Sequence, residues 1–251
     1  MPLPRHSRLR VVAILAVALG AGLILISRMT HQPVPVPANQ RLSEVRARVL
    51  PRLEAEAIAA GLRVGAPVLV RGFKESRELE IWMEPAAGGR FVLFRTYPIV
   101  NWGTGTLGPK LREGDGQSPE GFYEVAAGQL NPNSRHHLAF NIGFPNALDR
   151  SLGRTGSFIM VHGGDSSVGC LAVTDEKVEE IYLLVEAALH GGQSSVPVHL
   201  FPFRPTEARL EAARGSEWSG FWANLKEAYD RFETTRRPPS IRASGGGYRI
   251  D

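Results

Sequence analysis

The residues best suited to chemistry in this sequence are one cysteine and a histidine that precedes it by eight positions. Cys170 is the only cysteine of the 251-residue chain, and His162 lies upstream of it in the stretch of residues 158–174. A thiol attacks as its thiolate, and with an ordinary pKa near 8.5 only about 3% is ionised at pH 7, so it needs a base beside it. We therefore interpret the pair as a thiol nucleophile with a neighbouring imidazole base.

A loop of small residues joins these two side chains. Apolar, β-prone runs at residues 158–161 and 171–173 flank the loop and predict strands. The loop contains three glycines that permit positive φ and a close approach of a substrate, namely Gly163, Gly164 and Gly169. The backbone amides of Val168, Gly169 and Cys170 could then point at an oxyanion as a carbonyl carbon becomes tetrahedral.

The residues alone leave a second interpretation open. A lone cysteine at the start of an apolar strand is often a buried, inert thiol, and a lone histidine is often a polar residue without chemistry. Asp165 could orient the imidazole or could be a turn residue only. Four other histidines show no metal-ligand spacing with a carboxylate or the cysteine, so we expect neither a metal nor a cofactor. They are His136, His137, His190 and His199.

The composition narrows the class of protein. A hydrophobic content of 43% is ordinary for a globular chain with a real core. The net charge is +4, but the arginines do not form one aromatic-interleaved stripe, so we expect no nucleic-acid partner. One cysteine excludes an intramolecular disulfide and a cysteine-rich metal site.

The first residues have the pattern of an export signal. Arg5, Arg8 and Arg10 precede an uninterrupted apolar run over residues 11–26. At about 1.5 Å per residue this run is roughly 24 Å long, slightly short of the ~30 Å bilayer core. Its length does not separate an uncleaved signal anchor, which we favour, from a cleaved signal peptide over residues 1–27. Both predict that the rest of the chain works outside the cytoplasm.

Changes in residue pattern predict the domain boundaries. Prolines alternating with valines indicate a stiff linker within residues 28–40. Helical periodicity follows over residues 41–64 and is interrupted at Pro51, which could open a second short helix. We expect the catalytic domain over residues 65–204, followed by a packed aromatic helix and a loose tail over residues 205–251.

The expected domain is rich in strands. Strands are predicted at residues 67–73, 79–83, 91–97, 122–125 and 196–203, the first three as an antiparallel meander. A glycine-rich passage over residues 101–121 suits tight turns and lacks the Gly-Lys-Ser/Thr ending of a phosphate loop. Residues 131–150 form a long polar loop that could wall a substrate groove. Thr174 and Gly191 should begin and end a packing helix.

Three motifs together resemble the L,D-transpeptidase catalytic (YkuD) family, and within it the YafK-type branch. They are His-Gly at residues 162–163 followed by Ser-Val-Gly-Cys at 167–170, Gly-Asp-Gly-Gln-Ser-Pro-Glu-Gly-Phe-Tyr at 114–123, and Asn-Ile-Gly-Phe-Pro-Asn at 141–146. The similarity extends over residues 66–239. It implies an α+β fold, mainly a β L,D-transpeptidase catalytic domain with flanking helices, and a periplasmic enzyme without a cofactor.

The resemblance also implies a reaction and its residues. Enzymes of the family cleave a peptidoglycan stem peptide after its third residue and form an acyl-enzyme on the cysteine. The acyl group then passes to an amine or to water. Carried over by motif, Cys170 is the nucleophile, His162 is the base that later protonates the leaving amine, and Gly169 with Cys170 supplies the oxyanion donors. Gly163 follows the base, and Ser167 matches a loop serine with a structural or substrate-positioning role.

Two departures from the usual family loop keep the outcome open. Val168 stands where a histidine is usual, and the segment between His162 and Cys170 is shorter. Both features resemble the YafK-type branch, which is associated with hydrolysis that detaches lipoprotein from peptidoglycan as well as with transpeptidation. The acceptor stays open, as does a non-catalytic module that binds the cell wall. With Val168 at this position, His162 would have to serve both proton-transfer steps alone.

Overall fold

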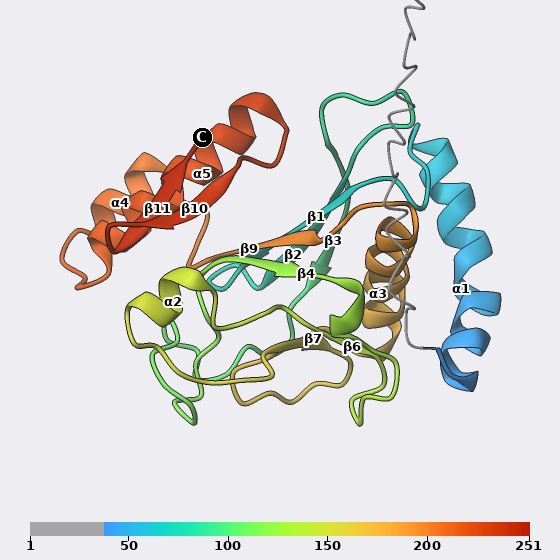
Figure 1. The fold of residues 1–251 in the computed structure, drawn as a ribbon, viewed down its shortest axis with the longest axis horizontal. Coiled ribbons are helices and arrows are strands. Elements are labelled where there is room, and N and C mark those ends of the chain that lie inside the picture. Colours follow the sequence, from blue (N-terminus) through green and yellow to red (C-terminus); the bar gives the residue numbers. More distant parts are fainter. Residues whose placement is uncertain (1–37) are drawn as a thin grey trace, which may run out of the picture. The chain divides into compact units, whose positions relative to one another are not determined.

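A computed structural model describes residues 38–251 of the chain (Figure 1). The predicted export segment at residues 1–27 and nearly all of the predicted linker lie outside the described residues. Within residues 38–251, no helix is both long and apolar enough to cross a membrane.

A five-stranded sheet lies at the centre of the fold, in the order β3-β2-β1-β9-β4. Its strands are β1 (Val68–Phe73), β2 (Glu78–Met83), β3 (Val92–Pro98), β4 (Gly121–Val125) and β9 (Val196–Phe201). The first three form the expected antiparallel meander. β9 lies parallel to β1 and antiparallel to β4. The chain between β4 and β9 therefore leaves this sheet, and it carries both His162 and Cys170.

That connection forms a second sheet, in the order β5-β6-β7-β8. Its strands are β5 (Leu130–Asn131), β6 (Ala139–Asn141), β7 (Met160–His162) and β8 (Leu171–Ala172). The expectation of an unbroken loop over residues 131–150 is wrong, because the segment contains β6 and the short helix α2 (Ala147–Ser151). Asn146 and Asp149 cap the start of α2 reciprocally, each side chain accepting from the other's backbone amide.

Two long helices lie side by side next to the sheets (Figure 1). α1 spans Gln40–Ala59 as one helix, so the second helix considered at Pro51 does not form. The apolar stripe keeps its helical spacing across the proline, and packing of this stripe outweighs the one lost backbone hydrogen bond. α3 spans Asp175–His190 and ends at Gly191, as expected. Thr174 occupies its N-cap position, but its side chain makes no capping hydrogen bond.

The C-terminal residues pack on side chains of β1, β2, β4 and β9. α4 (Glu207–Ala212) and α5 (Ser219–Thr235) are followed by a hairpin of β10 (Ile241–Ser244) and β11 (Gly247–Ile250), so the expected loose tail is wrong. The hairpin is held because Tyr248 is buried and its backbone N–H and C=O both bond to the Asn224 side chain. The aromatic face of α5 packs into this part of the core, as expected.

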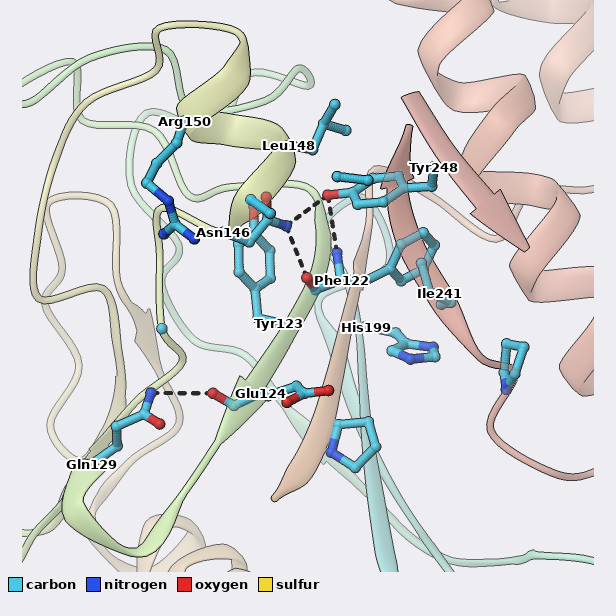
Figure 2. Close-up of a pocket in the computed structure, with 15 residues that line it drawn as sticks. Phe122, Tyr123, Glu124, Gln129, Asn146, Leu148, Arg150, His199, Ile241 and Tyr248 are labelled. Carbon is cyan, nitrogen blue, oxygen red and sulfur yellow. Dashed lines mark hydrogen bonds between the residues drawn. The ribbon is translucent and has the colours of Figure 1, made fainter. Parts of the chain in front are cut away.

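The outer edge of β4 is satisfied by side chains (Figure 2). The Phe122 carbonyl accepts from Asn146 Nδ2 at 2.8 Å, and the Phe122 amide donates to the Tyr248 hydroxyl at 3.4 Å. The Glu124 carbonyl accepts from Gln129 Nε2 at 3.1 Å. A cavity of about 500 Å³ lies beside this edge. The capped edge protects β4 from pairing with another chain.

Candidate active site

Cys170 and His162 line one cavity of about 660 Å³. β7 lies parallel to β8 and places Val161 beside Leu171 and His162 beside Ala172. Continued by one residue, this register brings Cys170 to Met160, whose amide donates to Cys170 Sγ at 3.4 Å. Met160 and His162 share a strand face because residues two apart on a strand point the same way. The two side chains that the sequence pattern singled out thus line the same cavity, although within residues 38–251 no hydrogen bond joins Cys170 Sγ to the His162 ring.

The imidazole of His162 is oriented by a backbone carbonyl. His162 Nδ1 lies 2.6 Å from the carbonyl oxygen of Gly163. Because that oxygen can only accept, Nδ1 carries the proton and Nε2 keeps its lone pair, which is the tautomer that a general base needs. Asp165 is exposed, and within residues 38–251 no hydrogen bond joins it to the ring. The orienting role weighed for Asp165 therefore belongs to Gly163.

The ring and the thiol are both uncharged at rest. Burial lowers the pKa of His162, His136 lowers it further, and the Gly163 carbonyl opposes both effects. Burial raises the pKa of Cys170 above that of an ordinary thiol, although the Met160 amide and the charge of Lys110 act the other way. The pair is therefore a thiol beside a neutral base, and the proton must move as the sulfur attacks.

This electrostatic state predicts slow alkylation of Cys170. Its thiolate fraction at pH 7 should lie below the roughly 3% of an ordinary thiol, so reaction with iodoacetamide should be slow there. The rate should still rise with pH beyond about 8.5, because the thiol ionises only as pH passes its raised pKa. Intact mass measures this rate without ambiguity, since the chain has one cysteine. A rate that levels off below pH 8 would contradict the raised pKa.

The nucleophile loop is held by two serines. Ser167 Oγ donates to the Cys170 carbonyl at 2.7 Å. Buried Ser118 places its Oγ 2.6 Å from the Trp102 carbonyl oxygen and 2.9 Å from that of Gly169. The motif over residues 114–123 is visible in the sequence, but the role of Ser118 is not. Its contacts depend on two segments that meet only in the fold.

The glycine-rich passage supports the same loop by close backbone contact. A side chain added at Gly103 would place its Cβ 2.0 Å from the Gly116 carbonyl oxygen, and one added at Gly169 would lie 2.8 Å from that of Gln117. Gly169 also has a φ of +103°, which side chains rarely adopt. Among the described residues, no hydrogen bond is found from the amides of Gly169 and Cys170. Of the two residues, Cys170 lines the cavity, whereas Gly169 is buried beside Gly103.

The rest of the cavity is polar on one side and apolar at its mouth. Residues 131–136 contribute the polar side, which bears out the expectation that this segment walls a groove. Phe158 and Val168 lie at the cavity and are 70% and 83% exposed. Phe158 has a φ of +53°, and its carbonyl accepts from Cys170 Sγ at 3.5 Å. An exposed Val168 offers no proton-transfer group in place of the histidine that is usual there.

The other described histidines have separate environments. His136 lies in the cavity with its ring centroid 4.6 Å from that of His162. His137 Nε2 pairs with Glu179 at 2.8 Å. His199 is buried, and burial together with Arg71 lowers its pKa to about 3. No group of three or more potential metal ligands is found in the part of the chain that the structure describes.

The chain is similar to known proteins over most of its length. The family model for the L,D-transpeptidase catalytic domain (YkuD) matches residues 80–199. The chain is 44% identical to YafK of Escherichia coli (strain K12) over 185 residues, which cover 74% of each protein. The same identity and coverage hold for YafK of Escherichia coli O157:H7.

Two solved structures are more distant. The helical cell shape determining protein Pgp2 from Campylobacter jejuni is 19% identical, with 81% of this chain and 79% of that chain covered and a TM-score of 0.43. Bd1075 of Bdellovibrio bacteriovorus is 15% identical, with 72% and 78% covered and a TM-score of 0.39. At these scores neither carries an argument about the site.

Proposed function

We propose an acyl-transfer reaction at Cys170 for this chain, which belongs to the L,D-transpeptidase catalytic domain (YkuD) family. The α+β fold expected for that family is confirmed. The observation that carries the proposal is the meeting of the single thiol with an imidazole whose Nδ1 is bound to the Gly163 carbonyl. This arrangement leaves Nε2 as the base in a cavity that opens to solvent.

The first half of the reaction forms a thioester. His162 Nε2 takes the thiol proton as Cys170 Sγ bonds to the substrate carbonyl carbon. The resulting oxyanion accepts hydrogen bonds from the amides of Gly169 and Cys170, which have no hydrogen-bond partner within the described residues. As the oxyanion collapses, the C–N bond breaks and the imidazolium gives its proton to the leaving amine. Sulfur and imidazole are then ready for an acceptor.

The second half resolves the thioester. An amine or a water molecule gives a proton to His162 Nε2 while attacking the thioester carbonyl, and the Cys170 sulfur leaves and recovers the proton. The substrate proposed is a peptidoglycan stem peptide, cut after its third residue at the L-centre of a diamino acid. An amine acceptor makes a cross-link or attaches a protein. Water gives the alternative outcome, L,D-hydrolysis that releases a wall-attached protein such as a lipoprotein.

Mass spectrometry of purified sacculi incubated with the enzyme distinguishes these outcomes. We expect new cross-links if an amine resolves the thioester, and tripeptide ends with released protein if water does. Cys170→Ser is the matched variant, since it keeps the side-chain shape and weakens the nucleophile. If neither protein gives more products than sacculi incubated alone, a non-catalytic module that binds the wall is favoured instead.

We also propose that the chain works in the periplasm, where peptidoglycan lies. Residues 11–26 would tether it to the inner membrane, or a signal over residues 1–27 would be removed. Fractionation followed by N-terminal sequencing separates the two. A cytoplasmic protein with an intact N-terminus would contradict both.

A further inference from the structure

We propose that the first turn of α1 is a positioning element of the active site, which acts through residues 132–138, here called the wall loop. Its effect on turnover rests on the proposed function, whereas its effect on the His162 ring can be measured without any substrate. The sequence patterns predicted only packing for this helix. The contacts of Asn39 and Arg41 point to a positioning role as well.

Both residues bind the wall loop, through three backbone carbonyls and one side chain. Asn39 Nδ2 donates to the Pro132 carbonyl at 2.8 Å and to Asn133 Oδ1 at 2.7 Å. Arg41 Nη1 donates to the Ser134 carbonyl at 3.0 Å and to the His137 carbonyl at 2.6 Å. Asn39 Oδ1 also accepts from the Leu42 amide and caps α1. The start of the helix and the shape of the wall loop are therefore fixed by the same side chains.

The wall loop needs such support because its backbone is strained. His137 has a φ of +63°, a conformation that costs a non-glycine residue roughly 1 kcal/mol or more. Arg41 holds its carbonyl, and Glu179 of α3 holds its ring at 2.8 Å. Glu179 is held in turn by Arg48 of α1 at 2.6 Å. Helix α1 thus supports the strained residue directly and through α3.

His136, which lies between the two wall-loop carbonyls that Arg41 binds, contacts the catalytic base. The rings of His136 and His162 lie 4.6 Å apart at an interplanar angle of 37°. The His136 carbonyl accepts from the Gly163 amide at 3.1 Å, and the carbonyl of the same Gly163 orients His162. A Cβ on Gly163 would lie 2.9 Å from the His136 oxygen, so no larger residue fits between them. The wall loop therefore contacts both the ring and the residue whose carbonyl orients it.

The groups that face His162 come from three other segments. His136 lies on its ring, and the Cys170 thiol shares the cavity. Asp175, at the start of α3, accepts from the Gly164 amide at 2.8 Å behind the orienting peptide. Of these, only His136 lies against the face of the ring. His136 therefore limits where the His162 ring can lie, and a displacement of about 1 Å in such a base can cost roughly a hundredfold in rate.

Arg41→Ala and Arg46→Ala form a matched pair of variants. Both remove one arginine of α1, but Arg46 pairs with Glu186 of α3 at 2.8 Å and, within residues 38–251, forms no hydrogen bond with the wall loop. We expect Arg41→Ala to speed hydrogen exchange at the wall loop about tenfold or more. We also expect it to lower kcat by roughly 10- to 100-fold with a smaller change in KM. Arg46→Ala should show neither effect.

Variants of His136 test the contact with the base. NMR titration of His162 should give a higher pKa in both His136→Ala and His136→Phe, because the neighbouring imidazole is removed in each. Only His136→Ala should lose kcat strongly, since phenylalanine keeps a ring against His162. Equal behaviour of Arg41→Ala and Arg46→Ala in exchange and kcat would overturn the proposal, as would a His162 titration unchanged by both His136 variants. If no muropeptide reacts but exchange and titration change as expected, the positioning holds and the proposed substrate is wrong.

Discussion

Cys170→Ala is expected to lower turnover of a muropeptide substrate by roughly 10⁴-fold or more, because the acyl-enzyme then has no sulfur to form on. The same variant should give no mass increase with a carbapenem, whose strained carbonyl the wild-type thiol would open to leave a stable adduct. Both can be measured on one preparation, by intact mass for the adduct and by chromatography of released muropeptides for turnover. The chain's single cysteine makes the adduct assignment direct.

Two further variants show whether the loss is chemical. His162→Ala should cost roughly 10²- to 10⁴-fold, as expected when a general base is removed. Ser167→Ala removes one hydrogen bond to the Cys170 carbonyl and leaves the thiol, so its loss should be much smaller. An adduct that persists in Cys170→Ala, together with unchanged muropeptide release, would refute the acyl-enzyme. If Cys170→Ala loses the carbapenem adduct but releases muropeptides as before, turnover takes place at a site other than Cys170.

The meeting of His162 and Cys170 could be predicted because it is local. Two apolar runs flank a short loop of small residues, and their parallel pairing sets Cys170 level with Met160, two residues before His162. The member that orients the base could not be predicted in the same way. Asp165 is a side-chain candidate visible in the sequence, whereas the Gly163 carbonyl that takes the role belongs to the backbone and leaves no mark on residue type.

Contacts between residues that are distant in sequence could not be predicted from the sequence pattern. Arg41 and His137 are 96 positions apart, and nothing in either segment indicates the other until α1 packs. The C-terminal residues looked loose for a related reason. Two prolines and three glycines interrupt residues 236–251, but Tyr248 buries its ring and bonds Asn146, 102 positions earlier in the sequence. Local pattern predicts elements, whereas single anchoring side chains decide where irregular segments lie.

Glu120 is the residue whose loss should most reduce stability. Its side chain is fully buried, and Oε1 accepts from Lys74 Nζ at 3.0 Å and from the Gly108 amide at 2.8 Å. Oε2 accepts from Trp222 Nε1 at 2.7 Å. Burial lowers the pKa of Lys74, and the Glu120 charge opposes that effect. One carboxylate therefore joins the end of β1, the glycine-rich passage and α5.

Glu120→Ala should lower the free energy of unfolding by about 3–5 kcal/mol, since it leaves the Lys74 charge buried without a partner. Denaturant titration measures this loss. The double variant Lys74→Met with Glu120→Leu should recover only part of it, because no charge is then buried but the Gly108 amide and Trp222 Nε1 still lack an acceptor. Glu211→Ala, which removes an exposed ion pair with Arg214, is the surface control and should change stability by no more than about 0.5 kcal/mol.

The pH dependence of the loss also reports the charge state of Lys74. If Lys74 sheds its proton when its partner is gone, it stays buried as a neutral amine, and that deprotonation costs about 4–5 kcal/mol at pH 7 for an unfolded pKa near 10.4. In that case the variant should become less stable as pH falls, since a folded-state pKa below the unfolded one favours proton uptake on unfolding. A large loss that does not vary between pH 6 and 9 would instead show that the charge stays buried, and that Glu120 is what makes this burial tolerable.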